Sequence, residues 1–261
     1  GTQQSQLFND SKVDGVFGIW YGKGPGVDRT GDVFKHANAA GTSKHGGVLA
    51  LAGDDHTCKS STLPHQTEYA FMDAMIPVLA PAGVQEFLDL GVHGISLSRY
   101  SGCYVAFKTI AETVDTSASV YVDPHRVQVE LPDETEFKMP EGGLNIHYPK
   151  QALEALAQEE HLHRYKLYAA IAYAKKNKLN RAMIESPKKR LGIVTAGKSY
   201  LDVRQAMDDL GVDEEFAKEL GISVFKVAMT WPLEPDSIRE FCQGHEEILV
   251  VEEKRALIEN Q

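Results

Sequence analysis

The sequence contains few cysteines and no long apolar run, and both absences limit what the protein can be. Its three cysteines stand at positions 58, 103 and 242. This spacing fits neither a disulfide scaffold nor a cysteine motif for zinc or iron–sulfur clusters. No segment approaches the roughly 18 apolar residues needed to cross a bilayer, and no basic-then-apolar signal peptide is present. We therefore predict a reducing, cytoplasmic setting and no membrane partner.

Positive charge is also in short supply. Lys and Arg number 27 against 37 Asp and Glu, which gives a formal net charge of -10. Such an acidic chain argues against nucleic acid as the main partner. With 261 residues, the chain can bury one large core or two smaller ones. Both ends resemble interrupted helices, and we therefore expect a fragment of a longer protein.

The most informative segment is an apolar run followed directly by polar side chains. Val48 to Ala52 has the composition of a strand buried on both faces, as in a parallel sheet. Ligands of open α/β sheets bind beyond the carboxyl ends of the strands, and we therefore expect a functional site after Gly53. The reactive side chains there are Asp54, Asp55, His56, Cys58, Lys59, Ser60 and Ser61.

A second apolar run, Val13 to Trp20, leads into a glycine-rich segment at residues 21–32. Its glycines allow close backbone approach, and Lys23 and Arg29 supply cationic donors. The segment lacks the Gly-Lys-Ser/Thr ending of a P-loop. It also has a proline where the helix of a dinucleotide fingerprint starts. A ligand-binding loop and a purely structural turn both stay open.

The polar clusters also allow other interpretations. Asp54, Asp55, His56, Cys58 and His65 include metal-ligand types, but their spacing matches no standard site, so a metal-dependent hydrolase is an alternative only. The acids and histidines at 159–163 are better explained as a solvated helix face. A non-catalytic interaction module is the remaining alternative.

Strands and helices are predicted to alternate along the chain. Helices are expected over 66–73, 82–97 and 151–180, strands over 75–79 and 104–107, and an irregular excursion over 115–150. The composition changes at Ser186 to Arg190, where we place a domain boundary. Residues 191–251 then predict a small α/β unit with a parallel sheet. We expect a tight turn at Gly197 and an acid-rich helix N-terminus at Glu252 to Arg255, where an interdomain or cofactor-facing role stays open.

Seven segments carry a family resemblance, and their order and number make it specific. They are Gly22–Arg29, Gly31–Asn38, Ala52–Thr62, Leu63–Gln66, Arg99–Cys103, Gly143–Ile146 and Lys198–Arg204. Together they closely resemble the long, fused indolepyruvate ferredoxin oxidoreductases, which are thiamine-dependent 2-oxoacid:ferredoxin oxidoreductases. The resemblance covers nearly the whole chain.

The resemblance implies an α/β fold with two parts. Residues 1–185 would form most of a thiamine-diphosphate-binding domain of the pyrimidine type, a parallel sheet with helices on both faces. Residues 190–261 would begin a smaller transketolase-C-terminal-like α/β domain. The activating glutamate, the Gly-Asp-Gly motif that holds the diphosphate with Mg²⁺, and the [4Fe-4S] cysteines are expected elsewhere in the full-length enzyme. This chain alone is then expected to be inactive and to bind no cofactor tightly.

The resemblance also implies a reaction, the oxidative decarboxylation of aryl 2-oxoacids to acyl-CoA by a homo-oligomer, with coenzyme A and ferredoxin as partners. We predict that this chain supplies surface facing cofactor and substrate. Cationic candidates for a carboxylate or a coenzyme A phosphate are Lys23, Arg29, Lys59 and Arg99, and polar candidates are Ser60 and Ser61. Asp54, Asp55 and His56 should share one rim with Lys23 and Arg29, towards the pyrimidine or substrate. Loop-fixing contacts are the alternative role for each.

Overall fold

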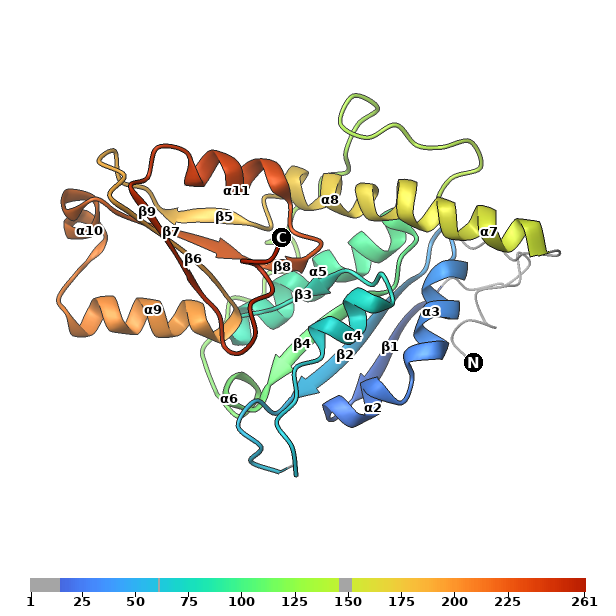
Figure 1. Cartoon of the computed structure of the whole chain (residues 1–261), viewed down its shortest axis with the longest axis horizontal. Helices are drawn as coiled ribbons and strands as arrows, with labels where there is room; N and C mark the ends of the chain where they lie inside the picture. The colour runs from blue at the N-terminus through green and yellow to red at the C-terminus, as the bar shows by residue number, and fades with distance from the viewer. Residues whose placement is uncertain (1–14, 61, 146–151) are drawn as a thin grey trace.

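Two β-sheets organise the chain (Figure 1). The structure, a computed structural model, describes residues 15–60, 62–145 and 152–261. The first sheet has the order β1-β2-β4-β3-β8 and the second has the order β5-β7-β6-β9. The strands are β1 Val16–Tyr21, β2 Gly47–Asp54, β3 Val78–Leu79, β4 Val105–Ile110, β5 Arg181–Ile184, β6 Leu191–Ala196, β7 Ile222–Val227, β8 Met229–Trp231 and β9 Glu247–Val251.

The first sheet is parallel except at one edge. β1, β2, β4 and β3 pair in parallel, with Phe17 opposite Val48 and Ala50 opposite Ala106, while β8 pairs antiparallel with β3. The expected strand at 48–52 is confirmed as the interior of β2, which is buried along most of its length. Its carboxyl end is Asp54, and the polar segment therefore follows a central strand.

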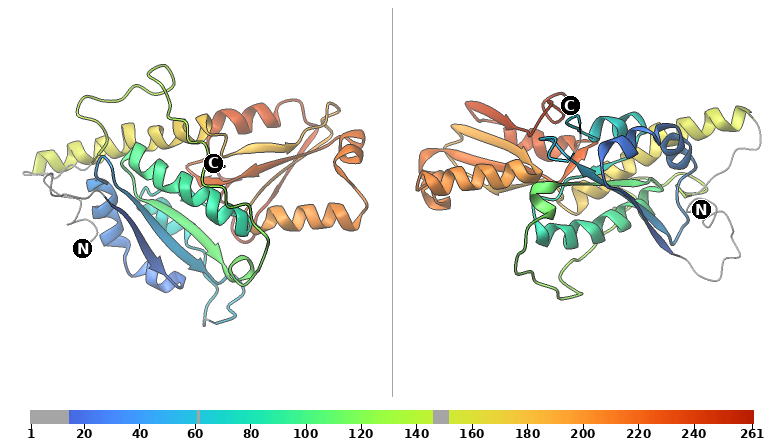
Figure 2. Two further views of the ribbon diagram at one scale, coloured as in Figure 1. Left: turned by 180° about the vertical axis from the view of Figure 1, so that it is seen from behind. Right: turned by 90° about the horizontal axis from the view of Figure 1, so that it is seen from below.

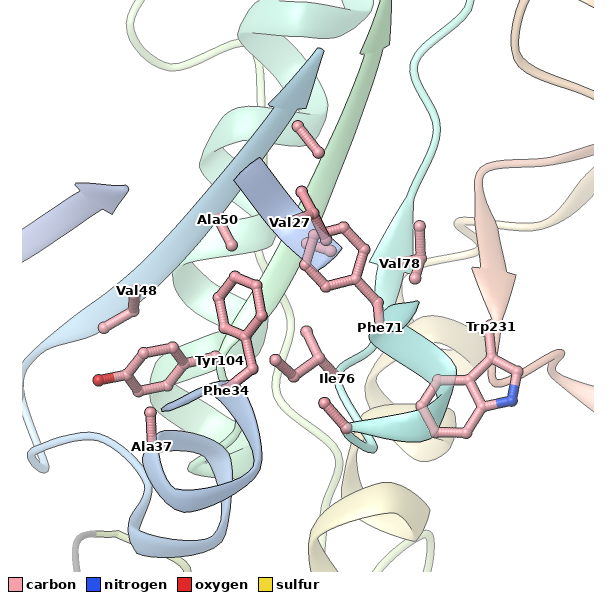
Figure 3. Packing of buried hydrophobic residues seen from close by; sticks show 13 residues of the cluster. Val27, Phe34, Ala37, Val48, Ala50, Phe71, Ile76, Val78, Tyr104 and Trp231 are labelled. Carbon is pink, nitrogen blue, oxygen red and sulfur yellow. The ribbon is translucent and has the colours of Figure 1, made fainter. Parts of the chain in front are cut away.

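Helices cover both faces of the first sheet (Figure 2). On one face, α2, α3 and α4 pack over Val48, Ala50 and Ala106, and Trp231 of β8 joins this core (Figure 3). On the other face, α5 packs over β2 and β4, and α8 packs against α5. The helices are α2 Gly24–Asp28, α3 Gly31–Ala40, α4 Glu68–Asp73, α5 Val84–Ser101, α6 Ala111–Val114, α7 Ala152–His161 and α8 Leu167–Lys176.

Two expectations for this part need correction. The glycine-rich segment is helical rather than an open loop, because Pro25 stands in the first turn of α2, where its missing N–H removes no helical hydrogen bond. The long helix near 151–180 is interrupted by a π-helical turn, η1 Leu162–Lys166. That turn lets the buried Lys166 reach the carbonyl oxygen of Ala39 at 3.0 Å, at the end of α3. Residues 115–145 contain no helix or strand, as predicted.

The second sheet has α9 Gly197–Asp209 and α10 Glu214–Leu220 on one face, and α11 Pro235–Cys242 on the other. Its strands β6, β7 and β9 are parallel, as expected, and β5 adds an antiparallel edge. β5 precedes the boundary placed at 186–190, and β8 returns to the first sheet before β9 rejoins the second, so the chain passes between the two units three times. None of the helices in the described ranges is long and apolar enough to span a bilayer.

The expected helix at 252–255 is wrong. Residues 252–261 form turns without a helix, since the carboxylate of Glu252 accepts the backbone N–H groups of Leu257 and Ile258 at 2.9 and 2.8 Å. These two side chains are buried beneath the segment. The acid that was expected to begin a helix instead folds the chain back on itself.

Candidate functional site

The carboxyl edge of the first sheet gathers the two polar segments, as the topology predicts. The ammonium of Lys23 donates a hydrogen bond to the carbonyl oxygen of Ser60. Next to it, a Cβ added to Gly24 would lie 2.5 Å from the ring of His65, and only glycine allows this approach. The segment after β1 and the loop after β2 are therefore packed together on one rim.

Asp55 organises the loop that follows β2. Its two carboxylate oxygens accept the backbone N–H groups of Lys59 and Ser60, each at 2.8 Å. The amide of Ser60, helped by that of Lys59, stabilises the ionised form and lowers the pKa of Asp55. Its backbone carbonyl also accepts the N–H of His65 at 3.2 Å. Asp55 thus has the loop-fixing role that was the alternative to ligand binding.

Asp54 is buried more deeply and is less well satisfied. One carboxylate oxygen accepts both the backbone N–H and the hydroxyl of Thr67, at 2.9 and 3.0 Å. The other oxygen, Oδ1, is buried and has no hydrogen-bond partner among the described residues. Burial, together with the nearby carboxylate of Glu68, raises the pKa of Asp54. A buried acceptor without a donor is costly to a fold and marks a place for a ligand or water.

His56 has an acceptor at each ring nitrogen. Nδ1 lies 2.7 Å from the carbonyl oxygen of His65, and Nε2 lies 2.8 Å from Oε2 of Glu253. Both nitrogens act as donors only in the imidazolium form. Burial disfavours that charge, but the interaction with Glu253 outweighs burial and raises the pKa of His56. The ring therefore links the first unit to the segment after β9, and its contact with Glu253 favours the protonated form.

Lys108 and Glu68 complete the site, and neither was expected from the sequence. Lys108 of β4 lies 2.5 Å from Oε1 of Glu68 and 3.8 Å from Oε2 of Glu253. Burial opposes its charge, but the two carboxylates outweigh burial and raise the pKa of Lys108. A lysine within the apolar run of β4 was the available signal, because a buried ammonium requires partners. We call Asp54, His56, Glu68, Lys108 and Glu253 the ionic cluster.

A cavity of about 40 Å³ lies beside the ionic cluster, between the two sheets, with room for a few water molecules. The ends of β3, β4, β6 and β9 all reach it. Its polar lining includes Glu68, Lys108, Lys198 and Glu253. The buried hydroxyl of Thr230 and Oε2 of Glu68 have no hydrogen-bond partner within the described residues. The arrangement joins unpaired acceptors and cations at the edge where α/β sheets bind ligands.

The sequence is similar to that of known indolepyruvate oxidoreductases. The indolepyruvate oxidoreductase domain family matches residues 181–261. The indolepyruvate oxidoreductase subunit IorA of Pyrococcus abyssi is 28% identical over 219 residues, which are 83% of this chain and 32% of that protein. The subunit IorA of Methanothermobacter marburgensis is 26% identical over 250 residues, 95% of this chain and 37% of that protein. The chain therefore spans about a third of the length of these relatives.

The chain is therefore similar to proteins of the indolepyruvate oxidoreductase type. A solved 2-oxoglutarate:ferredoxin oxidoreductase from Magnetococcus marinus, with 2-oxoglutarate, coenzyme A and succinyl-CoA bound, has the same fold. The superposition covers 90% of this chain and 45% of the chain of that enzyme, with a TM-score of 0.58 and 16% sequence identity. The expected α/β fold class is confirmed. The family match begins at residue 181, the first residue of β5, and so coincides with the second sheet.

The other predicted site residues do not all lie in the ionic cluster. Lys59 lies on the rim, 2.8 Å from a carboxylate oxygen of Glu112. Arg29 follows α2, is exposed, and forms no ion pair with a described residue. Ser61 lies outside the described residues.

Arg99 is separated from the rest of the candidates. Its Nε donates to the carbonyl oxygen of Gly46 at 2.8 Å, just before β2 begins. It therefore lies at the amino edge of the sheet, a strand length of roughly 23 Å from Asp54. The structure does not bring Arg99 together with the rim.

A metal centre finds no support in the residues that the structure describes. No three of their His, Cys, Asp and Glu side chains are grouped so that they could hold a metal ion. Asp54, Asp55 and His56 diverge: their partners are Thr67, the loop amides and Glu253. The alternative of a metal-dependent hydrolase therefore has no site in the described part of the chain.

Proposed function

We propose that the chain is part of a thiamine-dependent indolepyruvate ferredoxin oxidoreductase and supplies surface facing cofactor and substrate. The full-length enzyme would oxidatively decarboxylate an aryl 2-oxoacid to an acyl-CoA and reduce ferredoxin. The observation that carries the role of this chain is the ionic cluster at the carboxyl edge of the first sheet, with the unpaired Oδ1 of Asp54. The family names and the ligands bound to the related enzyme support the reaction class.

The buried hydrogen-bond acceptors of this edge fit one end of thiamine diphosphate better than the other. Oδ1 of Asp54 and Oε2 of Glu68 are buried acceptors that an amino group or a ring N–H would satisfy. A diphosphate placed beside the same carboxylates would be repelled. We therefore place the aminopyrimidine or the substrate here, and the diphosphate, Mg²⁺ and [4Fe-4S] cluster in other parts of the full-length enzyme. Bound thiamine diphosphate supplies the nucleophilic carbon for addition to the keto group.

The residues of this chain would bind and orient rather than perform the carbon chemistry. Lys23 and Lys59 are held by Ser60 and Glu112, which positions their charges along the rim. Arg29, exposed beside them, is the candidate for the substrate carboxylate or a coenzyme A phosphate. None of the three cysteines forms a disulfide within the described residues, which supports a cytoplasmic enzyme, and we expect it to be a homo-oligomer.

The test is CoA-dependent reduction of ferredoxin by the full-length enzyme, with indolepyruvate and 2-oxoglutarate compared as substrates. We expect turnover with indolepyruvate and a much lower kcat/KM with 2-oxoglutarate. Preference for 2-oxoglutarate would contradict the aryl specificity, and turnover without added thiamine diphosphate after dialysis would contradict the cofactor. The 261-residue chain alone is expected to be colourless and inactive in the same assay.

A further inference from the structure

A short segment of the second unit contacts the site loop of the first unit at several points. Residues 253–256 follow β9, and we call them the clamp segment. The site loop is residues 54–67 and begins with the last residue of β2. Glu253 pairs with the ring of His56 at 2.8 Å, and the ammonium of Lys254 donates to the carbonyl oxygen of His56 at 3.1 Å. Two residues of the clamp segment thus hold one residue of the site loop.

The contacts continue along the clamp segment. The backbone N–H and Nε of Arg255 both donate to Oε1 of Gln66, each at 3.2 Å. The guanidinium of Arg255 lies over the ring of Tyr69, 3.8 Å from its centre, and the Tyr69 hydroxyl donates to the carbonyl oxygen of Ala256 at 2.5 Å. The contacts therefore lie near both ends of the site loop, at His56 and Gln66, and continue into α4 at Tyr69.

The clamp segment is anchored within the second unit. Glu252 fixes it from one side through the N–H groups of Leu257 and Ile258, whose side chains are 3% and 5% exposed. Like the clamp segment, residues 55–60 and 62–67 contain no helix or strand. Glu253 also meets Lys108 of β4 and the backbone N–H of Lys198 at the start of α9. One carboxylate therefore connects both sheets with the loop.

We propose that the clamp segment positions the site loop from the second unit, with Glu253 as the central positioning residue. The proposal rests on the function proposed above, because the site loop carries most of the candidate residues. Glu253 lines the cavity beside the ionic cluster, and it acts on the site loop through the ring of His56. The second unit is on this view part of the substrate site and more than a scaffold.

Backbone hydrogen exchange of the 261-residue chain tests the proposal without any assay of activity. The variant is Glu253→Gln, which removes the charge and keeps the size, and the matched control is Glu259→Gln, an exposed acid six residues along. The amides to follow are those of Lys59, Ser60, His65 and Thr67 in the loop. We expect their exchange to accelerate about tenfold or more, the effect of losing one hydrogen bond to a charged group.

The amides of β6 and β7 provide the internal reference. They should keep their protection in Glu253→Gln, and Glu259→Gln should change neither set. Loop protection that is unchanged, or that falls equally in both sheets, would overturn the proposal. If Glu253→Gln does not fold, Lys254→Ala replaces it, because Lys254 is exposed and should loosen the same four amides by a smaller factor. An unchanged loop in Lys254→Ala would then overturn the proposal.

The exchange result and the enzymatic result are separable. Loosened loop amides together with no 2-oxoacid turnover by the full-length enzyme would retain the positioning role and reject the proposed function. In an active full-length enzyme, Glu253→Gln should raise KM for the 2-oxoacid at least tenfold. The Glu259→Gln control should leave both KM and the melting temperature at native values.

Discussion

The ammonium of Lys108 lies 2.5 Å from a carboxylate oxygen of Glu68, and both side chains are almost entirely buried. An ion pair in this setting is weak support for stability as a pair, but breaking it is expensive, because the remaining charge has neither water nor a partner. In this protein the uncompensated negative charge would be larger, since Asp54 and Glu253 lie within the same cluster.

Lys108→Met is therefore expected to lower the free energy of unfolding by about 3–5 kcal/mol. Urea unfolding of the 261-residue chain measures this effect. The matched control is Lys35→Met, which breaks an exposed pair with Asp73 and should cost no more than about 1 kcal/mol. Equal effects of the two substitutions would show that the cluster is hydrated and that Lys108 is not held in a dry site.

Asp54→Asn is expected to stabilise the chain at neutral pH. Burial and Glu68 raise the pKa of Asp54 above its ordinary value of 3.8, so the folded state favours the protonated carboxyl. That contribution is present below the unfolded pKa and is lost as the pH rises through the folded pKa. The stability difference between Asp54→Asn and the native chain should therefore grow as the pH rises.

Urea unfolding of both proteins across the acid-to-neutral range measures this difference. Asp208→Asn, an exposed substitution on α9, is the control and should show no such growth. A stability difference that shrinks with rising pH would mean that the carboxylate of Asp54 is well solvated or paired with a cation.

His56 should contribute stability with a definite pH dependence. Its folded pKa lies above the ordinary 6.5, because the interaction with Glu253 outweighs burial. The contribution is complete below pH 6.5 and is lost as the pH rises through the higher folded pKa. NMR titration of the imidazole should show this raised pKa, and Glu253→Gln should lower it, because burial and the charge of Lys108 then oppose protonation while only the His65 carbonyl favours it. An unaltered His56 titration in that variant would mean that another carboxylate provides the charge.

Gly24 offers a steric test of the rim. A methyl group on this residue would meet the His65 ring at 2.5 Å, and Gly24→Ala should therefore cost about 1–3 kcal/mol through overpacking. Gly31 at the start of α3 has no atom within 4 Å of the same position. Gly31→Ala should then be neutral or stabilise the chain by up to about 1 kcal/mol. Thermal unfolding measures both, and a neutral Gly24→Ala would mean that the site loop moves aside easily.

Local patterns sufficed for most of the fold, and the failures have a common physical cause. The apolar run of β2 is encoded in adjacent residues and was placed correctly. The pairing of Lys108 with Glu68 joins residues 40 positions apart, and the return of β8 to β3 joins different units. Neither leaves a periodic signal. These long-range contacts are the ones that build the ionic cluster.

The site residues show the same division. Lys23 and the loop after Gly53 were expected on one rim because each follows a parallel strand, and this is confirmed. Arg99 ends α5, and a helix that connects parallel strands returns the chain to the amino edge of the sheet. Its position was therefore inferable from connectivity, although residue type and family motif favoured the other edge. The acid run at 252–255 failed as a helix start because Glu252 is occupied with its own downstream amides.

The two arginines allow the placement of the substrate to be tested directly. Arg29 is exposed on the carboxyl edge and belongs to no ion pair among the described residues, whereas Arg99 supports the carbonyl of Gly46 at the opposite edge. In the full-length enzyme, Arg29→Ala should raise KM for the 2-oxoacid, or weaken thiamine diphosphate binding, by about tenfold or more, as expected for a lost charge-assisted contact. Its melting temperature should change little, because the Arg29 side chain forms no ion pair with a described residue.

Arg99→Ala should show the reverse pattern. Loss of its hydrogen bond to Gly46 is expected to cost about 0.5–3 kcal/mol of stability, while KM and cofactor affinity stay at native values. Steady-state kinetics and thermal unfolding of the same two preparations separate the effects. A KM effect in Arg99→Ala with none in Arg29→Ala would move the substrate to the amino edge of the sheet and remove the carboxyl edge from the site.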